Sequence, residues 1–597
     1  MQQHTAPPAP ATSDNIPISE SPTSSTSSVP AMDIQAHTAG SSVPLDGGCM
    51  KFDRLGTANY VGSPHWAAVL DSITELKEHF EREEELCHMP TDFTPPDPGH
   101  SSWPQLLYGY GYQWATKAEI LASIPPRRAA DRLVSRYFAL DISPGESTTS
   151  QREYDQFWKD PSAAPIMWVG LLFTVMCLGE LHQHAPAAMD STPGMSTLSV
   201  DTFRERIVQC LMMGKYSKGG PYVLESLIQH YMIEHYLRQD AEFEIWILLG
   251  MLIPISLRMG LHRDPKHFTE ISAFAGEMRR RVWATIFQYD VGFSALAGLP
   301  RVIKPHQCDT EEPRNLLDSD FDENTRELPP SRPESEATPV LFLLAKNRTI
   351  SVGGVISDLA HDTRPYPYAE LSRVEKLLQD TRNSLPASLR WQPLSQSIIQ
   401  GPQAILQRVY LDIFSHRMQI ILYKKYLLAS MTQSQYHHAR EVCLDSAMRI
   451  LEHQHLLDEE TELDGRLSSV RWTYSSIINH DFMLAVSVLC FYIKRYNENN
   501  KVVDQETFQK ITSLLRKSHQ IWLRSSTASN EAQKAVQALS IVLGIQTQVP
   551  GEDGEITRCS HFSDGSADLF PQFSNPAASW PVYQDSTRIL TQTALRL

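Results

Sequence analysis

Cysteine is sparse in this chain, and its spacing is unlike that of a zinc-binding module. The 597 residues contain eight cysteines, at positions 49, 87, 177, 210, 308, 443, 490 and 559. A structural zinc site needs four thiolate or imidazole ligands held together, and a C-x-x-C pair normally marks it. No such pair occurs in the sequence. Scattered thiols on a long chain are typical of a reducing compartment, so we predict free cysteines and no metal site.

The signatures of the common enzyme classes are also missing. The chain has no GK[ST] phosphate loop, no G-x-S-x-G elbow and no H-E-x-x-H pair. Three histidine pairs lack a third ligand nearby, and we interpret them as solvated surface residues: His182/His184, His437/His438 and His453/His455. The sequence therefore predicts no catalytic residue and no cofactor, and we expect that the protein is not an enzyme.

Basic charge and long apolar runs are both in short supply. The net charge is −16, and the first 50 residues contain no Lys or Arg. An acidic chain is repelled by the phosphates of DNA unless it carries a local basic face. The longest apolar runs, Ile166–Leu178 and Ile245–Leu257, are shorter than the ~20 residues that a membrane-spanning helix needs. No signal peptide is visible. We predict an intracellular protein without a membrane segment, and two buried core helices at these runs.

Composition divides the chain into four parts. Residues 1–58 form a Ser-, Thr- and Pro-rich arm with too little apolar surface to order itself. Residues 59–104 contain an amphipathic helix and a Pro-rich connector. Residues 105–548 have helical periodicity almost throughout, and residues 549–597 are an irregular tail of acidic and aromatic residues. The prediction is an all-α protein, with one large irregular multi-helix domain between disordered arms.

Three segments between residues 59 and 548 allow a more specific prediction. Apolar residues recur at steps of three and four between Trp66 and Phe80, after a helix start at Ser63 and Pro64. This helix either docks on the main domain or binds a partner. The acidic, Pro-rich stretch Glu311–Pro339 is expected to be a surface loop. Residues 406–421 carry an apolar stripe of helical period.

Several motifs, taken in their order, resemble one family. They are EYDQFWKDPSAAPIMWVGLLFTVMCLG at 153–179, LRMGLHRDP at 257–265, EMRRRVWATIFQYD at 277–290 and ALAGLPRVI at 295–303. The chain is similar to the middle homology region, or regulatory domain, of fungal transcription factors. The zinc-cluster DNA-binding module that normally accompanies this region is not found in these 597 residues. The resemblance implies a nuclear regulator with an all-α regulatory domain.

The residues that carry this resemblance lie mostly between 258 and 300. They are Arg258, Gly260, His262, Arg263, Asp264, Arg279, Arg280, Arg281, Trp283, Asp290, Gly298 and Pro300. Arg279, Trp283 and Phe287 are spaced by four, so Arg279 is expected to lie against an aromatic face. A buried guanidinium needs a carboxylate, and Asp264 and Asp290 are the candidates. We interpret these residues as an internal ionic brace; an anion or ligand site and a DNA contact are the alternatives. Gly260 suits a helix end or a close helix contact.

The chain departs from the family pattern in three places. Ala284 stands where the family usually has a second aromatic residue. The glycine–arginine–proline turn appears as Gly298, Leu299, Pro300, with Arg301 displaced by one position. The stretch at 142–152 replaces a usual family element, so a function that depends on that loop is not expected here.

The first functional hypothesis is regulation of a metabolic or secondary-metabolite gene set. The resemblance implies contact with the transcription machinery, and contact with promoter DNA through a zinc-cluster partner or through a missing N-terminal exon. A small-molecule effector would gate the helical domain, and the acidic tail would serve as an activation segment or be a plain tail. The second hypothesis is a helical domain that binds or converts a small hydrophobic metabolite. The third is an inhibitory decoy of a full-length relative.

Overall fold

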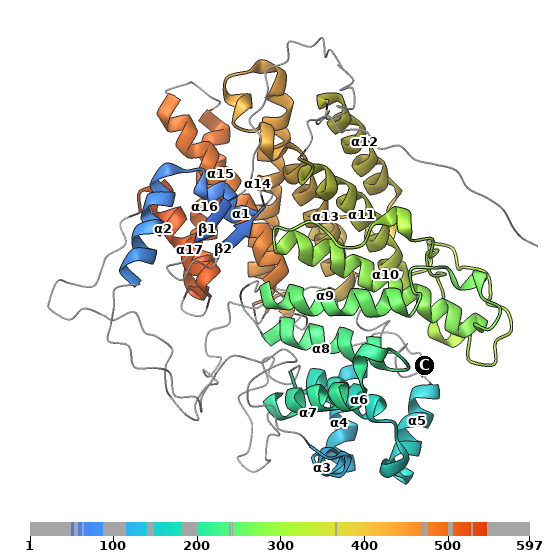
Figure 1. Ribbon diagram of the computed structural model, residues 1–597. Helices are drawn as coiled ribbons and strands as arrows, with labels where there is room; N and C mark the ends of the chain where they lie inside the picture. The colour runs from blue at the N-terminus through green and yellow to red at the C-terminus, as the bar shows by residue number, and fades with distance from the viewer. Residues whose placement is uncertain are drawn as a thin grey trace, which may run out of the picture. The chain divides into compact units, whose positions relative to one another are not determined.

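The computed structural model describes most of the chain between residues 49 and 545 (Figure 1). The gaps in this description are 53–57, 63–64, 88–114, 140–147, 182–199, 238–239, 241–242, 364–366, 463, 469, 471–475, 500–504 and 527–528. The chain divides into Met1–Pro44 and Leu45–Leu597, and every described residue belongs to the second unit. The predicted acidic tail and the pair His182/His184 lie outside the described residues.

The all-α prediction is confirmed. The α-helices are α1 (Trp66–Asp71), α2 (Thr74–Cys87), α3 (Lys117–Ala122), α4 (Arg127–Ala139), α5 (Thr148–Lys159), α6 (Ile166–Leu181), α7 (Val200–Met213), α8 (Val223–Leu237), α9 (Phe243–Arg258), α10 (Ala273–Leu296), α11 (Pro339–Ala360), α12 (Tyr368–Ser384), α13 (Pro402–Tyr423), α14 (His437–Glu460), α15 (Ser476–Asn499), α16 (Gln505–Ser525) and α17 (Asn530–Leu543). The described strands, β1 (Cys49–Phe52) and β2 (Ala58–Val61), form one antiparallel hairpin that pairs Cys49 with Val61.

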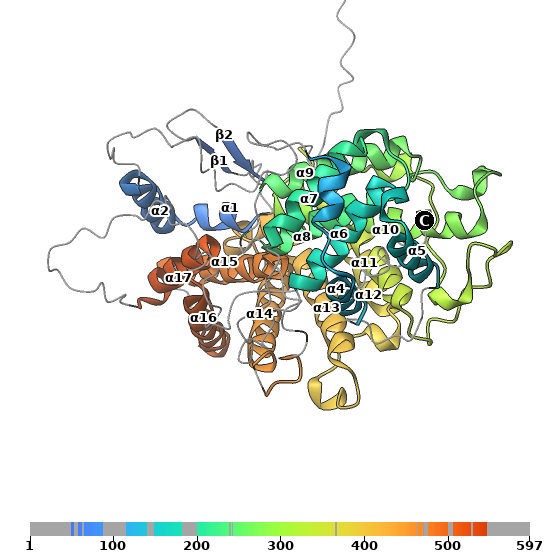
Figure 2. The ribbon, with the colours of Figure 1, turned by 90° about the horizontal axis from the view of Figure 1, so that it is seen from below.

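Two groups of helices build the core. In the first, α6 packs against α4, α7 and α8. In the second, α13 packs against α11, α14 and α15, and α10 joins the groups through α9 and α11 (Figure 2). Every residue of α6 from Met167 to Glu180 is buried, because the helix is apolar on all its faces and neighbours cover each of them. The predicted stripe at 406–421 is likewise buried at each apolar position.

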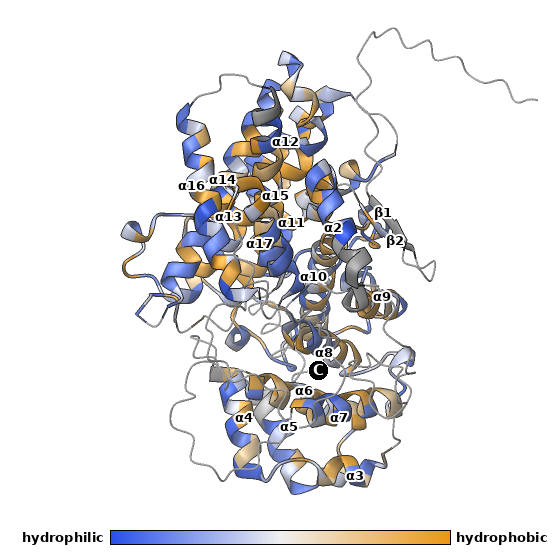
Figure 3. Cartoon of the chain, turned by 90° about the vertical axis from the view of Figure 1, so that its left-hand side faces the viewer, coloured by the Kyte–Doolittle hydropathy of each residue, from blue (hydrophilic) through white to orange (hydrophobic). Residues whose placement is uncertain are grey.

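The prediction that Ile245–Leu257 forms a buried core helix is only half right. Leu248, Leu249 and Leu252 are buried, but Ile247 and Leu257 are 46% and 37% exposed. Gly250 and Pro254 lie on the same outer face, at heptad spacing. In Figure 3, much of the ribbon of α9 carries the apolar colour. A continuous apolar run carries no periodicity, so it does not predict which face of the helix is exposed.

Among the described residues, one helix is long and apolar enough to cross a membrane, and it is α11. In its most apolar window, 78% of the window is buried inside the protein. It contacts α10, α12 and α13, and it carries Lys346 and Arg348. This is the burial of a core helix.

The helix predicted after Ser63 is present as two helices. His65 is the N-cap of α1, where its Nδ1 accepts a hydrogen bond from the backbone of Ala67. The helix is interrupted at Ser72, whose hydroxyl group donates a hydrogen bond to the Val69 carbonyl. The next helix, α2, starts at Thr74. Serine competes for backbone hydrogen bonds in this way and interrupts helices. The residues Ser63 and Pro64 lie outside the described part of the chain.

Candidate functional site

The candidate site is the motif helix α10, together with the turn before it and the acidic loop after it. Asp264 in the turn is fully buried and forms a two-point ion pair with Arg280 of α10. The Oδ2–Nε distance is 2.9 Å and the Oδ1–Nη2 distance is 2.8 Å. The same carboxylate accepts from the backbone amides of Glu311 and Lys266. Burial alone would raise the pKa of Asp264, but these donors outweigh it and lower the pKa to about 2.

Arg281, which is fully buried, is the centre of a second group. Its Nε lies 3.0 Å from Oε1 of Glu277, one turn earlier, and its Nη1 lies 2.7 Å from Oδ1 of Asp318 in the loop. The Phe321 ring lies 5.1 Å from the guanidinium carbon. Glu277 also accepts from the backbone amide of Arg314. Burial raises the pKa of Glu277, against the opposite effect of Arg281.

The expected partner of Arg279 is wrong. Its Nη2 donates 2.5 Å to the backbone carbonyl of Met259, and Asp264 is taken by Arg280. The predicted stacking partner Phe287 faces a different guanidinium, that of Arg301, at 6.0 Å. Burial lowers the pKa of Arg279. A spacing of four residues places side chains on one helix face. It does not indicate which of the three adjacent arginines binds the turn that contains Asp264.

Asp290 lies towards the C-terminal end of α10, and its carboxylate is bound by backbone amides rather than by an arginine side chain. Its two oxygens accept from the backbone amides of Val302 and Ile303, at 2.9 and 2.6 Å. Burial raises its pKa, and these two amides oppose that effect. Gly298 ends the helix with φ +65°, and the Leu299 amide bonds back to Ser294. Pro300 follows on the surface. The carboxylate therefore fixes the direction in which the chain leaves the helix.

The turn before α10 is fixed in a similar way. Gly260 has φ +75°, and Leu261 bonds back to the Ser256 carbonyl, so the glycine ends α9 as one of its two readings predicted. Arg263 pairs with Asp309 through Nε and Nη2, at 3.0 and 3.1 Å. The remaining motif residues of this turn make weaker contacts. Arg258 donates to the Ser217 carbonyl, and the His262 ring lies 6.4 Å from the Trp283 ring.

The departures from the family pattern have local reasons. Ala284 is buried in a cluster with Val340, Leu343 and Leu344, so its small side chain lets α11 approach α10. Arg301, the displaced arginine, forms a two-point ion pair with Asp358 of α11, at 3.0 and 2.6 Å. The displaced arginine thus ties α10 to α11, because an arginine at this turn can reach a carboxylate on the next helix.

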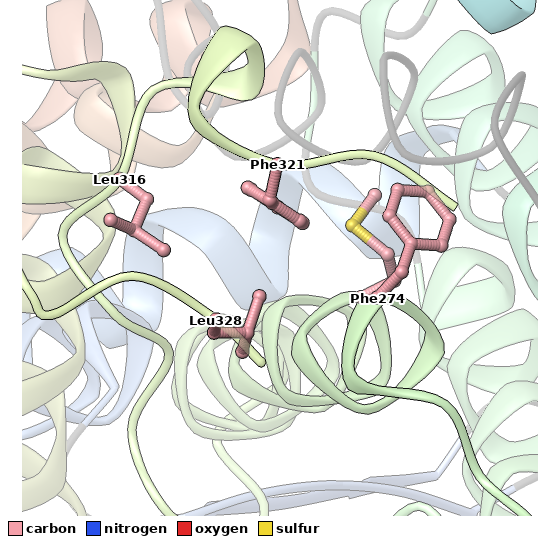
Figure 4. Close-up of a cluster of buried hydrophobic side chains, with 5 residues drawn as sticks. Phe274, Leu316, Phe321 and Leu328 are labelled. Atoms are coloured by element: carbon pink, nitrogen blue, oxygen red, sulfur yellow. The ribbon is translucent and has the colours of Figure 1, made fainter. Parts of the chain in front are cut away.

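The stretch Glu311–Pro339 is a loop, as predicted, but it is anchored along its length. Its acidic residues pair with basic residues of the body and of the loop itself: Glu311 with Lys266 and Arg280, Glu312 and Glu334 with Arg348, Asp318 with Arg281, and Asp320 with Arg332. Leu316, Phe321 and Leu328 of the loop bury themselves on Phe274 and Met278 of α10 (Figure 4). The sequence signal for these ion pairs is the high density of acidic residues in the loop that follows the three adjacent arginines of α10.

A second buried polar group was missed from the sequence. Asp412 of α13 accepts from Arg382 of α12 and from Nε2 of His453, which lies 2.8 Å away on α14. His416 and Arg449 lie 3.7 and 3.5 Å from the same carboxylate. Burial opposes ionisation, but hydrogen bonding to His453 and the nearby cations hold the pKa of Asp412 well below its usual range.

The interpretation of the histidine pairs needs a correction here. His453 and His455 are buried, at 1% and 8% exposure, whereas the side chains of His437 and His438 are exposed. The closeness of two histidines in the sequence does not show whether a pair is exposed or buried. Burial depends on which face of α14 packs against α13. Asp412 and His453 are 41 residues apart, so the sequence did not link them.

The chemistry of these groups is that of structural ties. The carboxylates of Asp264, Glu277 and Asp290 are engaged by guanidinium groups and backbone amides, and none has a neighbouring nucleophile to activate. Within the described ranges, no group of three or more His, Cys, Asp or Glu side chains could hold a metal ion. The structure shows Cys177, Cys210, Cys308, Cys443 and Cys490 as free thiols. The arrangement defines a helical body braced by buried ion pairs, with no assembled reaction centre among the described residues.

Known proteins share this body. The family model described as "Fungal specific transcription factor domain" matches residues 148–455, which include α5 to α13, the acidic loop and most of α14. The fusarisetin A cluster transcription factor of a Fusarium species is 45% identical over 85% of this chain and 69% of its own length. The equisetin cluster transcription factor of Fusarium heterosporum is 43% identical, over 91% of this chain and 79% of its own length.

A third relative carries the zinc-cluster class in its name. The Zn(2)-C6 fungal-type transcription factor of Macrophomina phaseolina is 38% identical, over 86% of this chain and 70% of its own length. Fold and sequence together define a transcription-factor regulatory domain. The chain belongs to the fungal-specific transcription factor family, and it is a transcriptional regulator.

Proposed function

We propose that the protein acts in the nucleus and controls the genes of one secondary-metabolite cluster. The observation that carries this proposal is the 45% identity across 85% of the chain with a factor named for the fusarisetin A cluster. Another relative at 43% identity is named for the equisetin cluster. These names belong to those proteins.

The mechanism that we propose is regulation through protein contacts. The helical body holds its charges in internal pairs, and the net charge of −16 disfavours a direct grip on phosphates. DNA contact would come from a zinc-cluster module, which is the class named for the Macrophomina relative. A partner chain or a further part of the same protein would supply that module. The other partners would be the transcription machinery and a small-molecule effector, and we propose no catalytic role.

Deletion and tagging of the gene test the proposal. Loss of the gene should lower, or for a repressor raise, the transcripts of one contiguous biosynthetic cluster. A tagged chain should be recovered on the promoters of that cluster by chromatin immunoprecipitation. Unchanged cluster transcripts together with no promoter signal would contradict the proposal.

The source of the DNA contact needs a separate experiment. The purified chain should give no salt-sensitive, sequence-selective shift of cluster promoter fragments. The same chain with a zinc-cluster partner from the same cells should give one. A selective shift by the purified chain alone would show that the reader lies within these residues.

A further inference from the structure

The chain's own N-terminal segment is docked on the helical body. We call residues 58–62 and 65–76 the strap; it consists of β2, α1 and the start of α2. The amide of Gly62 donates to the carbonyl of Gly298, at the end of the motif helix α10, over 3.0 Å. Helix α1 contacts α15, and Figures 1 and 2 both show the two helices side by side. The strap therefore touches the turn that carries the family motif.

Two glycines make this contact possible. A Cβ on Gly62 would lie 2.3 Å from the Gly298 carbonyl oxygen, closer than any real contact. A Cβ on Gly298 would lie 3.1 Å from the Gly62 nitrogen and 3.2 Å from the His65 Cβ. Gly298 also has φ +65°, which other residues adopt only with strain. A side chain at either position would separate the strap from the turn.

A half-buried histidine and a buried one lie beside the glycine contact. The rings of His65 on the strap and His480 on α15 meet edge to face, with centroids 4.6 Å apart. Burial lowers the pKa of His65 to about 3, with Lys424 adding to the effect. Burial also lowers the pKa of His480, and His65 and Arg417 contribute. Both rings are therefore neutral when the strap is seated.

The other charged groups that face this pair can be named. Lys424 and Lys534 face His65, and Arg417 faces His480 while it is paired with Asp481 at 3.0 Å. Asp481 is thus engaged by an arginine, and the remaining charges are cations, so the surroundings resist protonation of either ring.

Apolar burial supplies most of the attachment. Trp66, Val69, Leu70, Ile73 and Leu76 are each between 0% and 6% exposed. At the far end, Lys494 of α15 pairs with Glu75 over 2.5 Å. These contacts confirm the docking interpretation of the amphipathic segment.

We infer that α15 and the Gly298 turn form a docking site for the chain's own strap, and that the exit turn of α10 controls whether the strap is seated. The turn is held by Asp290 through the Val302 and Ile303 amides, and by Arg301 through Asp358. A shift in these ties moves Gly298 and thereby releases or retains the strap. The inference rests on geometry alone and does not depend on the proposed function.

Hydrogen exchange of the full chain, read by mass spectrometry, tests the docking. Gly298→Ala should speed exchange in peptides covering 65–76 by at least about tenfold, since about 1.4 kcal/mol of lost docking is a factor of ten. Exchange in α13 and α14 should not change. Gly544→Ala is the matched control, because Gly544 also ends a helix with φ +63° but has no atom within 4 Å of an added Cβ.

A second variant separates release of the strap from unfolding of the body. Gly62→Ala changes the strap alone and should give the same faster exchange at 65–76 with an unaltered body. Strap exchange equal to that of the unsubstituted chain in both Gly62→Ala and Gly298→Ala would overturn the inference.

The histidine pair gives an independent readout. Release of the strap exposes imidazoles whose ordinary pKa is near 6.5. Below that pH, strap opening, corrected for the intrinsic exchange rate, should rise about tenfold per pH unit for each ring that becomes solvated. His480→Gln should remove one ring's share of this slope. A flat profile between pH 6.5 and 4.5 would contradict the docking geometry.

Discussion

Asp264 and Arg280 form a buried two-point ion pair that joins the turn after α9 to the motif helix α10. The carboxylate is fully covered and the arginine side chain is 12% exposed. Removing one partner of such a pair leaves the other charge without compensation, which costs several kcal/mol. The brace is therefore sensitive to single substitutions.

Asp264→Asn should lower the unfolding free energy by about 3 kcal/mol, because Arg280 is left buried and two backbone amides lose a charged acceptor. Asp309→Asn is the control, since Asp309 is 41% exposed and its ion pairs are screened by solvent, and it should cost clearly less than Asp264→Asn. The measurement is the thermal midpoint near neutral pH. The folded pKa of Asp264 is lowered, so its contribution is present above about pH 4 and is lost as the pH falls towards 2. Equal losses for the two variants would contradict the brace.

Arg281→Met should destabilise the protein by about 3 to 5 kcal/mol, because it leaves the buried carboxyl group of Glu277 without its partner. The double variant Arg281→Met with Glu277→Gln should recover part of that loss, since the orphaned charge is gone. Denaturant unfolding of both single variants and the double variant completes the cycle. Additive losses in this cycle would show that the two side chains do not act as a pair.

Glu225→Gln should stabilise the protein at alkaline pH. Glu225 is 4% exposed on α8, and burial raises its pKa to about 7. The folded chain holds this proton more tightly than the unfolded chain, so stability is lost as the pH rises from about 4.5 through 7. The gain from the substitution should reach about 2 to 3 kcal/mol at pH 8 and vanish at pH 4.

Thermal midpoints at both pH values check the Glu225 prediction. Glu327→Gln, on the exposed part of the acidic loop, is the control and should have no effect at either pH. A pH-independent gain for Glu225→Gln would mean that the substitution acts by packing rather than by charge.

Asp412→Asn should loosen the junction of α12, α13 and α14. The carboxylate is 2% exposed, and Arg382 and His453 would lose their shared acceptor. We expect a loss of about 2 to 4 kcal/mol and faster hydrogen exchange in α12 and α14. Asp445→Asn, exposed on α14, is the matched control. Unchanged exchange in α12 would be the contrary result.

Much of this architecture was readable from the sequence, and the failures are specific. Helical periodicity gave the all-α body, and the apolar run of α6 gave a core helix. The open face of α9 could not be predicted, because a run without periodicity does not mark a face. Ser72 broke one expected helix into two, a local hydrogen bond that a spacing argument ignores.

The sequence predicted which types of residue make up the site, but not which residues pair with one another. Arginines and carboxylates were expected to form a brace, yet Arg279 bonds a carbonyl and Arg281 takes Glu277 and Asp318. Side-chain direction on adjacent helix positions decides this, and composition does not reveal it. Asp412 and His453 lie on different helices, so only the fold brings them together.

The acidic loop has a consequence for how the chain acquires its structure. The partner of Arg281, Asp318, lies 37 residues further along the chain, and the Glu311 amide that binds Asp264 lies 47 residues further along. During synthesis, the hairpin of α9 and α10 thus emerges before the groups that neutralise it. Fragments that stop between α10 and residue 318 should fail to fold on their own, whereas fragments that run past α11 carry every counter-charge that α10 is shown to need.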